Sequence, residues 1–220
     1  MDNIETASTA DSTIASWINA LAISDGAPGG GAASGIMLAI SASLTSMVCG
    51  YTSAEDQNQQ DALSSIDSRA QQLKSKALEL GDQDAAATNA FGAAFGMEPG
   101  PSRQQAVEAA SEQAAEASAA LGELAISAIA DLAWLAEHGN PSLIADVAVG
   151  LGALRAAVTG ARTNVSFDLS KLATDGTSLA EVHRAHPQLW QKVEQLTDAR
   201  EEIDRITAAI DHRAAPTDGR

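Results

Sequence analysis

Aromatic residues, cysteine and positive charge are all scarce in this 220-residue chain. Phe, Trp and Tyr make up 3% of it, so small and aliphatic side chains must fill the core. One cysteine, Cys49, excludes an intrachain disulfide and a thiolate cluster for zinc. Lys and Arg number 13 against 29 Asp and Glu, for a formal net charge of −16. Such a surface repels a phosphate backbone, so we expect no nucleic-acid partner.

Several catalytic and targeting signatures are also missing. The sequence has no GxSxG, no HExxH and no Walker loop. His183 and His186 lie three residues apart, but they are more typical of solvated surface residues than of metal ligands. The first residues, Met1 to Asp11, carry acids and no Lys or Arg, unlike a secretory signal. We therefore expect a cytoplasmic protein with no metal site.

The longest uncharged run extends from Ala32 to Tyr51. It meets the criterion of roughly 20 residues for a membrane span. Serine and threonine dilute its hydrophobicity, and Ala39 and Ala42 supply small surfaces for close packing, so we favour a buried helix and expect no membrane partner. A helix that is apolar on all sides needs cover from other helices, and in a chain of this size a second subunit would supply part of it.

Helical periodicity and capping signals divide the rest of the chain. They predict a short first helix, capped by Asp11 or Ser12, with an apolar stripe of Ile14, Trp17, Ile18 and Leu21. Two longer helices are predicted next, one from Glu55 to Phe95 with a kink at Gly81 and one from a capping box at Ser102 to Glu137. A further helix is predicted from Asn140-Pro141 to a point before Leu172, and after a turn at Asp175-Gly176 a last helix is predicted from Leu189 to Ile210. No period-2 run or fixed repeat favours a sheet or a solenoid. We predict an all-α bundle of long antiparallel helices, one domain over residues 1–212 with a flexible tail over 213–220.

A glycine-rich loop, Pro28-Gly29-Gly30-Gly31, directly precedes the uncharged helix. Glycines at such a position let the backbone approach a ligand, and the free N–H groups favour an anion such as a carboxylate. A flexible turn accounts for the same residues equally well. The local pattern leaves both interpretations open.

Three motifs in order resemble the cyclodeaminase/cyclohydrolase family, which comprises the C-terminal half of formiminotransferase-cyclodeaminase and stand-alone bacterial methenyltetrahydrofolate cyclohydrolases. The first runs from Ala27 to Gly35 and into Ser46-Met47-Val48. The second contains Leu80, Asp82, Asp84 and Phe91, ahead of the loop at Pro99. The third and best combines Gly139-Asn140-Pro141, Ala145-Asp146-Val147, Gly160-Ala161 and Asn164-Val165. The resemblance covers Ile14 to Leu172, which is most of the chain.

This resemblance implies an intertwined homodimer of helices that binds a tetrahydrofolate derivative as substrate, with no prosthetic group. The residues it suggests for substrate binding are Pro28, Gly29, Gly30, Gly31, Asn140 and Asn164. It implies one of two reactions: 5-formiminotetrahydrofolate closes to the methenyl form with loss of ammonia, or water adds to the methenyl form to give 10-formyltetrahydrofolate. Both pass through a tetrahedral carbon between two nitrogens and need proton transfer more than a metal.

Two aspartates are candidates for that proton transfer. The methenyl group is an amidinium-like cation, so a nearby carboxylate would offset its charge and move a proton. Asp146 is the first choice, because Ile144 and Val147 flank it in a mainly apolar helix, and Asp84 is the second. Arg103, Arg155 and Arg162 are available for the glutamate tail of the folate.

At three positions the chain departs from the family pattern. Ala32 and Ala145 stand where the family usually has serine, and Asp168 stands where a second asparagine is expected. Each change removes or alters a hydrogen-bonding group. The alternative hypothesis is therefore a catalytically impaired member that acts as a folate-binding or structural helical dimer.

Overall fold

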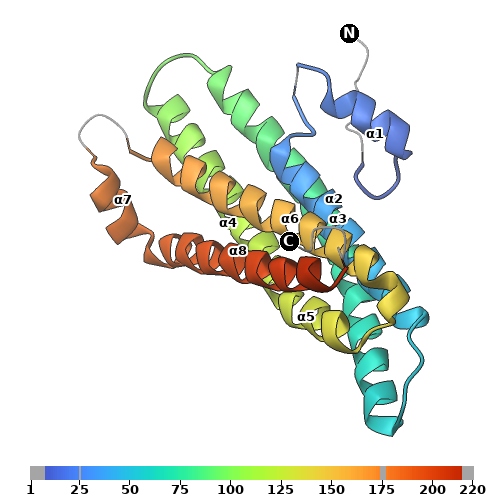
Figure 1. Ribbon diagram of the computed structural model, residues 1–220. Helices are drawn as coiled ribbons and strands as arrows, with labels where there is room; N and C mark the ends of the chain where they lie inside the picture. The colour runs from blue at the N-terminus through green and yellow to red at the C-terminus, as the bar shows by residue number, and fades with distance from the viewer. Residues whose placement is uncertain (1–7, 25, 174–176, 215–220) are drawn as a thin grey trace.

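The regular structure of the chain is helical throughout the part that the computed structural model describes, residues 8–24, 26–173 and 177–214 (Figure 1). The helices are α1 (Ile14–Leu21), α2 (Gly30–Gly50), α3 (Gln57–Phe95), α4 (Pro101–Ser127), α5 (Ile129–His138), the 3₁₀ turn η1 (Pro141–Leu143), α6 (Ile144–Lys171), α7 (Leu179–Ala185) and α8 (Pro187–Ala214). This confirms the all-α prediction and the long helices.

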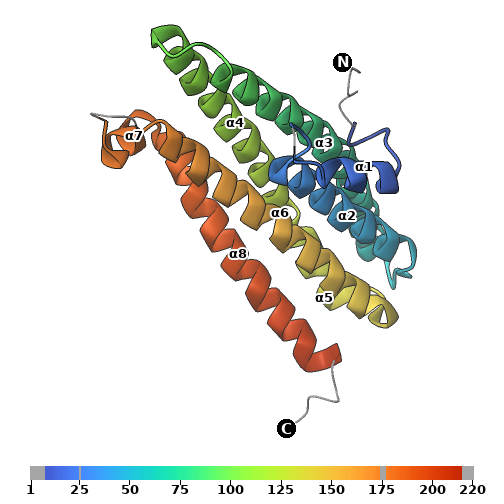
Figure 2. The same cartoon turned by 90° about the horizontal axis from the view of Figure 1, so that it is seen from above.

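Helix α2 lies against α3 and α6, and small residues allow the close approach. A Cβ atom added at Gly35 would lie 2.7 Å from the carbonyl oxygen of Ala77 on α3. On α6, Gly150 faces Leu44 and Gly160 faces Ser34, so α2 and α6 run antiparallel. Helices α4 and α8 pack on α6 from the other side (Figure 2). The uncharged run is thus a packed helix of the bundle, as its small residues predict.

Aliphatic side chains fill the core, as the scarcity of aromatics requires. The most deeply buried large side chains include Leu38, Leu132, Leu135, Leu151, Leu154 and Ile203. A smaller cluster around Val165 and Leu169 joins the end of α6 to α7 and α8. This second cluster fixes the C-terminal end of α6, which carries Asn164 and Asp168.

The alanine-rich stretch after Pro101 differs from its prediction in two ways. Helix α4 begins at Pro101 with Gly100 as its N-cap, and no capping box forms at Ser102. The stretch is also two helices, with a break at Ala128. At the break the Ser127 hydroxyl donates a hydrogen bond to the Leu124 carbonyl at 2.7 Å. A hydroxyl that bonds back to the preceding turn competes with the helical backbone and bends it.

Other boundaries differ less. The N-cap of α1 is Thr13, whose hydroxyl accepts from the Ser16 N–H at 3.2 Å, and neither Asp11 nor Ser12 caps it. The predicted stripe on α1 is only partly covered, because Trp17 is buried while Ile14 is 80% exposed. Helix α3 continues through Gly81. The last helix begins earlier than predicted, at Pro187, and reaches Ala214; the predicted turn at 175–176 and residues 215–220 of the predicted tail lie outside the described residues.

Three helical stretches, Gly30–Gly50, Pro101–His138 and Pro141–Lys171, are long and apolar enough to cross a membrane, judged by length and composition alone. In the bundle, 56% of the apolar window of Gly30–Gly50 is already buried against other helices. Hydrophobicity in this chain therefore serves helix packing to a large extent.

Candidate functional site

The glycine loop forms the N-terminal end of α2. Gly29 is the N-cap residue, and its carbonyl oxygen accepts the N–H of Ala33 at 3.0 Å, the first hydrogen bond of the helix. Pro28 is buried, and Gly30 and Gly31 form the first turn. A helix N-terminus presents unpaired N–H groups and the positive end of the helix dipole. The loop therefore offers a local positive potential in a strongly acidic chain.

The carboxylate of Asp84, on α3, lies directly on this end of α2. Its Oδ2 accepts the N–H of Ala32 at 3.0 Å. A Cβ atom on Gly31 would lie 1.9 Å from Asp84 Oδ1, so only glycine leaves room for the carboxylate. The sequence predicted that a carboxylate would suit these N–H groups, and the chain itself supplies one. Burial raises the pKa of the Asp84 carboxyl above its ordinary value, and the hydrogen bond from the Ala32 N–H opposes that rise.

The other two glycines of the loop face open space. A Cβ atom added at Gly29 or Gly30 would meet no atom within 4 Å. The loop thus has one side filled by Asp84 and one side that a ligand can reach. Because Gly29 and Gly30 have no side chains, a ligand on the open side can approach the backbone of the loop closely.

Helix α6 brings a third group to the same place. A Cβ atom at Gly160 would lie 2.0 Å from Ser34 Oγ, and the Ser34 hydroxyl donates to the Gly30 carbonyl at 2.9 Å. From Gly160, one and two helical turns lead to Asn164 and Asp168 along the same side of α6. Because α2 and α6 are antiparallel, these turns lead toward the glycine loop. Both side chains are half-buried there.

Asp168 is the residue whose importance the sequence did not reveal. Burial and, to a smaller extent, the negative charge of Asp84 raise its pKa to about 7, and Lys171 opposes the rise. The Asp84 carboxyl on α3 and the Asp168 carboxyl on α6 therefore interact electrostatically at the glycine-loop end of the bundle. In the sequence, the helical spacing of Asp168 from Gly160 and Asn164 was the available signal, and Asp168 otherwise stands out only as a departure from a motif.

Asn140 and Asp146 lie at the opposite end of α2. The Asn140 side chain accepts from the Ser142 N–H at 3.0 Å and donates to the Tyr51 carbonyl at 2.9 Å. Asp146 is half-buried in the first turn of α6. From there to Asp168, α6 rises about 33 Å at 1.5 Å per residue. Within one chain, therefore, Asp84, Asn164, Asp168 and the glycine loop come together, and Asn140 and Asp146 do not join them.

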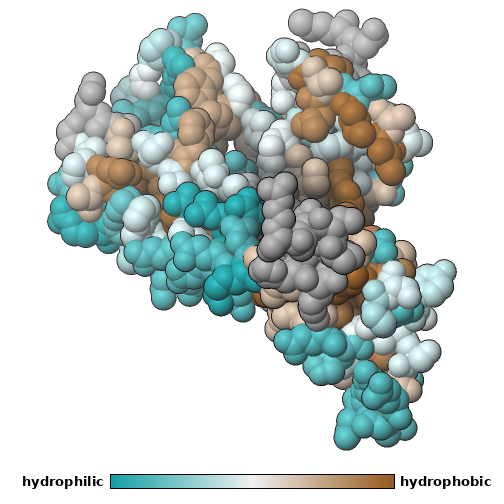
Figure 3. Space-filling model, viewed as in Figure 1, coloured by the Kyte–Doolittle hydropathy of each residue, from teal (hydrophilic) through white to brown (hydrophobic). Residues whose placement is uncertain are grey.

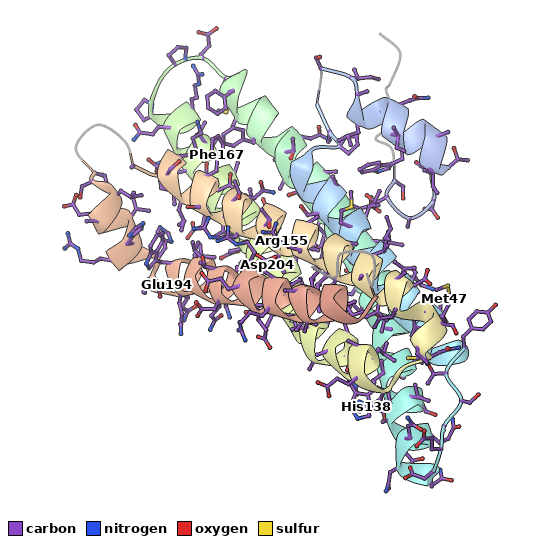
Figure 4. The ribbon with its side chains drawn as sticks, in the orientation of Figure 1. Met47, His138, Arg155, Phe167, Glu194 and Asp204 are labelled. Atoms are coloured by element: carbon purple, nitrogen blue, oxygen red, sulfur yellow. The ribbon has the colours of Figure 1, made fainter. Side chains whose placement is uncertain are left out.

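Figure 4 shows the same separation. Phe167, the neighbour of Asp168, lies toward one end of α6, whereas His138 and Met47 lie toward the other end of the bundle. Among the described residues, no group of three or more His, Cys, Asp or Glu side chains is placed to hold a metal ion.

A comparison against known families matches most of the chain to one of them. Residues 13–186 match the formiminotransferase-cyclodeaminase family. The chain belongs to this family. The match includes the glycine loop, Asp84, Asp146 and Asp168. The resemblance inferred from the three motifs is thereby confirmed.

A solved structure shows that the fold extends over nearly the whole chain. The formiminotetrahydrofolate cyclodeaminase from Thermotoga maritima superposes with a TM-score of 0.77 and 17% sequence identity, covering 91% of this chain and 96% of that one. At 17% sequence identity, this superposition shows that the two chains share a fold. A search of curated proteins gives no match.

The three arginines proposed for a folate tail have different surroundings in this family member. Arg155 forms an ion pair with Asp204, with Nη2 at 3.0 Å from Oδ2, and Figure 4 shows the two side by side between α6 and α8. Arg162 donates to the Thr197 hydroxyl at 2.7 Å. Arg103 lies over the Phe95 ring, 5.4 Å from its centroid. Arg155 and Arg162 therefore already serve the contact with α8.

Proposed function

We propose that this protein acts on a tetrahydrofolate derivative at the glycine loop of α2, closing or opening the one-carbon bridge between two folate nitrogens. Ammonia release from 5-formiminotetrahydrofolate is the reaction we favour. Family membership supports the substrate class, and the Thermotoga protein of the same fold is named for this reaction.

The observation that carries the proposal is the placement of Asp84. Its carboxylate is held by the Ala32 N–H beside an open, glycine-lined backbone, and its charge acts on Asp168 of α6 at the same end of the bundle. Closing the bridge produces the methenyl cation, and a buried carboxylate is suited to offset that charge and to accept a proton. Asn164, one turn from Asp168, is placed to orient the folate by hydrogen bonds.

The reaction is tested by offering 5-formiminotetrahydrofolate and methenyltetrahydrofolate separately to the purified protein. Absorbance of the methenyl form follows both, since it appears in the first case and disappears in the second. We expect the formimino compound to be consumed with release of ammonia. Consumption of the methenyl form alone would favour water addition, and no change with either would favour the impaired member.

Ala32 and Ala145, which stand where the resemblance leads us to expect serine, motivate the alternative of a catalytically impaired family member. Ala32 is fully buried and uses its backbone N–H to hold Asp84, a role that does not require a serine hydroxyl. Ala145 is exposed at the far end of α6. Neither substitution thus disturbs the Asp84 arrangement.

We propose further that the protein is a homodimer. Large apolar side chains on three helices remain exposed: Ile14 and Ile18 on α1, Met37 and Ile40 on α2, and Val149 and Phe167 on α6. Figure 3 shows hydrophobic surface over α1. Helix α2 carries no charged residue, so pairing along it adds no like-charge repulsion to a chain of net charge −16. A second copy would cover this surface.

Sedimentation tests the dimer directly. We expect a dimer at micromolar concentration and a monomer for the double variant Ile40→Glu, Val149→Glu. The double variant Gln72→Glu, Gln113→Glu, which adds the same two charges at exposed positions of α3 and α4, is the matched control and should remain dimeric. A monomeric parent protein would refute the dimer.

A further inference from the structure

Three helices contribute polar groups at the glycine-loop end of the bundle. Helix α2 supplies N–H groups and no charged residue over Gly30–Gly50. Helix α3 supplies Asp84, and α6 supplies Asp168. Two carboxyl groups at the same end of the bundle, with no metal-ligand set among the described residues, repel each other when both are ionised. One proton on the pair removes that repulsion.

The surroundings decide which member holds the proton. Asp84 accepts the Ala32 N–H and lies on the positive end of the α2 dipole, and both favour its ionised form. Among the described residues, no backbone N–H donates to the carboxyl of Asp168, which is half-buried on α6. The proton therefore belongs mainly to Asp168.

From this geometry we infer that Asp168 is the proton donor of the site and Asp84 the proton acceptor, the two sharing one proton at the glycine-loop end of the bundle. The inference rests on the proposed function and assigns its acid–base roles. It also gives the acid at position 168 a role that the asparagine expected from the resemblance lacks, because an amide has no acidic proton to transfer and a carboxylic acid does.

In the ammonia-releasing reaction the steps balance as follows. The N10 nitrogen attacks the formimino carbon, forming the N10–C bond, and its proton passes through the Asp84 carboxylate to the exocyclic nitrogen. Asp168 gives that nitrogen a second proton, the bond between it and the carbon breaks, and ammonia leaves the methenyl cation. Asp168 is then ionised and regains a proton from water, which restores the pair.

Asp84 and Lys171 are the charged groups that act on Asp168. Lys171 on the same helix acts against the rise of its pKa, and its ammonium lies over the Phe167 ring at 4.5 Å. On α4, Glu108 and Glu112 line a separate cavity of about 510 Å³ with His186 and Leu172, and Arg103 lies over Phe95. Among the described residues, Asp84 is thus the acidic group whose charge raises the pKa of Asp168.

The experiment measures turnover of 5-formiminotetrahydrofolate against pH for the parent chain, Asp168→Asn and Asp198→Asn. Asp198 is an exposed aspartate on α8 and controls for loss of one charge. We expect the parent kcat to fall above about pH 7 as Asp168 loses its proton. Asp168→Asn should lower kcat by about 10²-fold and should no longer show the fall in kcat above about pH 7. Asp198→Asn should keep the parent kcat and the parent pH dependence.

A second measurement uses the protein without folate. With ¹³C-labelled aspartate, we expect the Asp168 carboxyl to titrate near neutrality, and Asp84→Asn to lower its midpoint because the neighbouring charge is gone. An Asp168→Asn variant with the parent kcat and pH profile overturns the inference. So does a titration of Asp168 at its ordinary value. Failure of the parent to consume folate, with the titration as expected, refutes the proposed reaction and leaves the shared proton in place.

Discussion

The two ends of the α2–α6 pair look alike in sequence and differ in structure. Each end has a glycine or asparagine motif and a candidate aspartate. At the glycine-loop end, α3 brings Asp84 onto the α2 backbone and α6 brings Asp168 opposite. At the other end, Asn140 uses its side chain on Ser142 and Tyr51, and Asp146 is a single half-buried carboxyl in the first turn of α6.

The comparison shows that a motif identifies a site only when other helices complete it. An aspartate in the first turn of a helix is favoured by the helix dipole whether or not it has a catalytic role. Two carboxyl groups forced together have no such structural benefit, because burial and mutual repulsion both cost stability. We therefore place the reaction at the glycine-loop end, and four predictions test that choice.

The largest expected effect separates Asp84 from Asp146. Asp84→Asn should lower turnover by about 10²-fold or more, since the amide neither accepts the proton nor offsets the cation. Asp146→Asn should lower it much less. Steady-state rates of the two variants, with circular dichroism to confirm the fold, make the comparison. A larger loss for Asp146→Asn would move the reaction to the other end.

The second prediction contrasts two neighbouring glycines. Gly31→Ala places a methyl group where Asp84 lies, so we expect a loss of about 1–3 kcal/mol in unfolding free energy, typical of overpacking, together with loss of turnover. Gly30→Val meets open space and should leave stability near the parent value while weakening folate binding. Urea denaturation and calorimetric binding measure both. Equal stability losses would mean that Asp84 moves aside at no cost.

The third prediction concerns the pH dependence of stability. The pKa of Asp168 rises from 3.8 to about 7 on folding, so between these values the folded chain binds more protons than the unfolded one. Its contribution to the unfolding free energy therefore falls as pH rises through this window and is constant above it. Asp168→Asn should raise the melting temperature more at about pH 8 than at about pH 5. An equal shift at both pH values would exclude a raised pKa.

The smallest effect is expected at the far end. Asn140→Ala removes the cap of η1 and the bond to Tyr51, which should cost about 1 kcal/mol in unfolding free energy. Thermal melts measure this loss, and KM for the folate shows whether Asn140 has a second role. An increase in KM without a change in stability would give Asn140 the binding role that the sequence suggested.

Much of the fold followed from the sequence. The uncharged run from Ala32 and the helical periods of the long segments each predict a helix that the structure contains. Asn140 was predicted to cap the long helix before Leu172, but it caps the 3₁₀ turn η1, and α6 begins after that turn at Ile144. The break at Ala128 and the exposure of Ile14 were not predicted, because the first depends on a hydroxyl bonding back to Leu124 and the second on what covers α1. Neither leaves a signal in a periodic pattern.

The sequence by itself determined the helices, the family and the position of the glycine loop, since these depend on residues close together along the chain. The tertiary structure decided which aspartates meet. Asp84 and Asp168 are far apart in sequence, on two helices that both pack on α2, and only the antiparallel arrangement of those helices brings their carboxyl groups to the same end. The rise of α6, 1.5 Å per residue, carries Asp146 away from that end for the same reason.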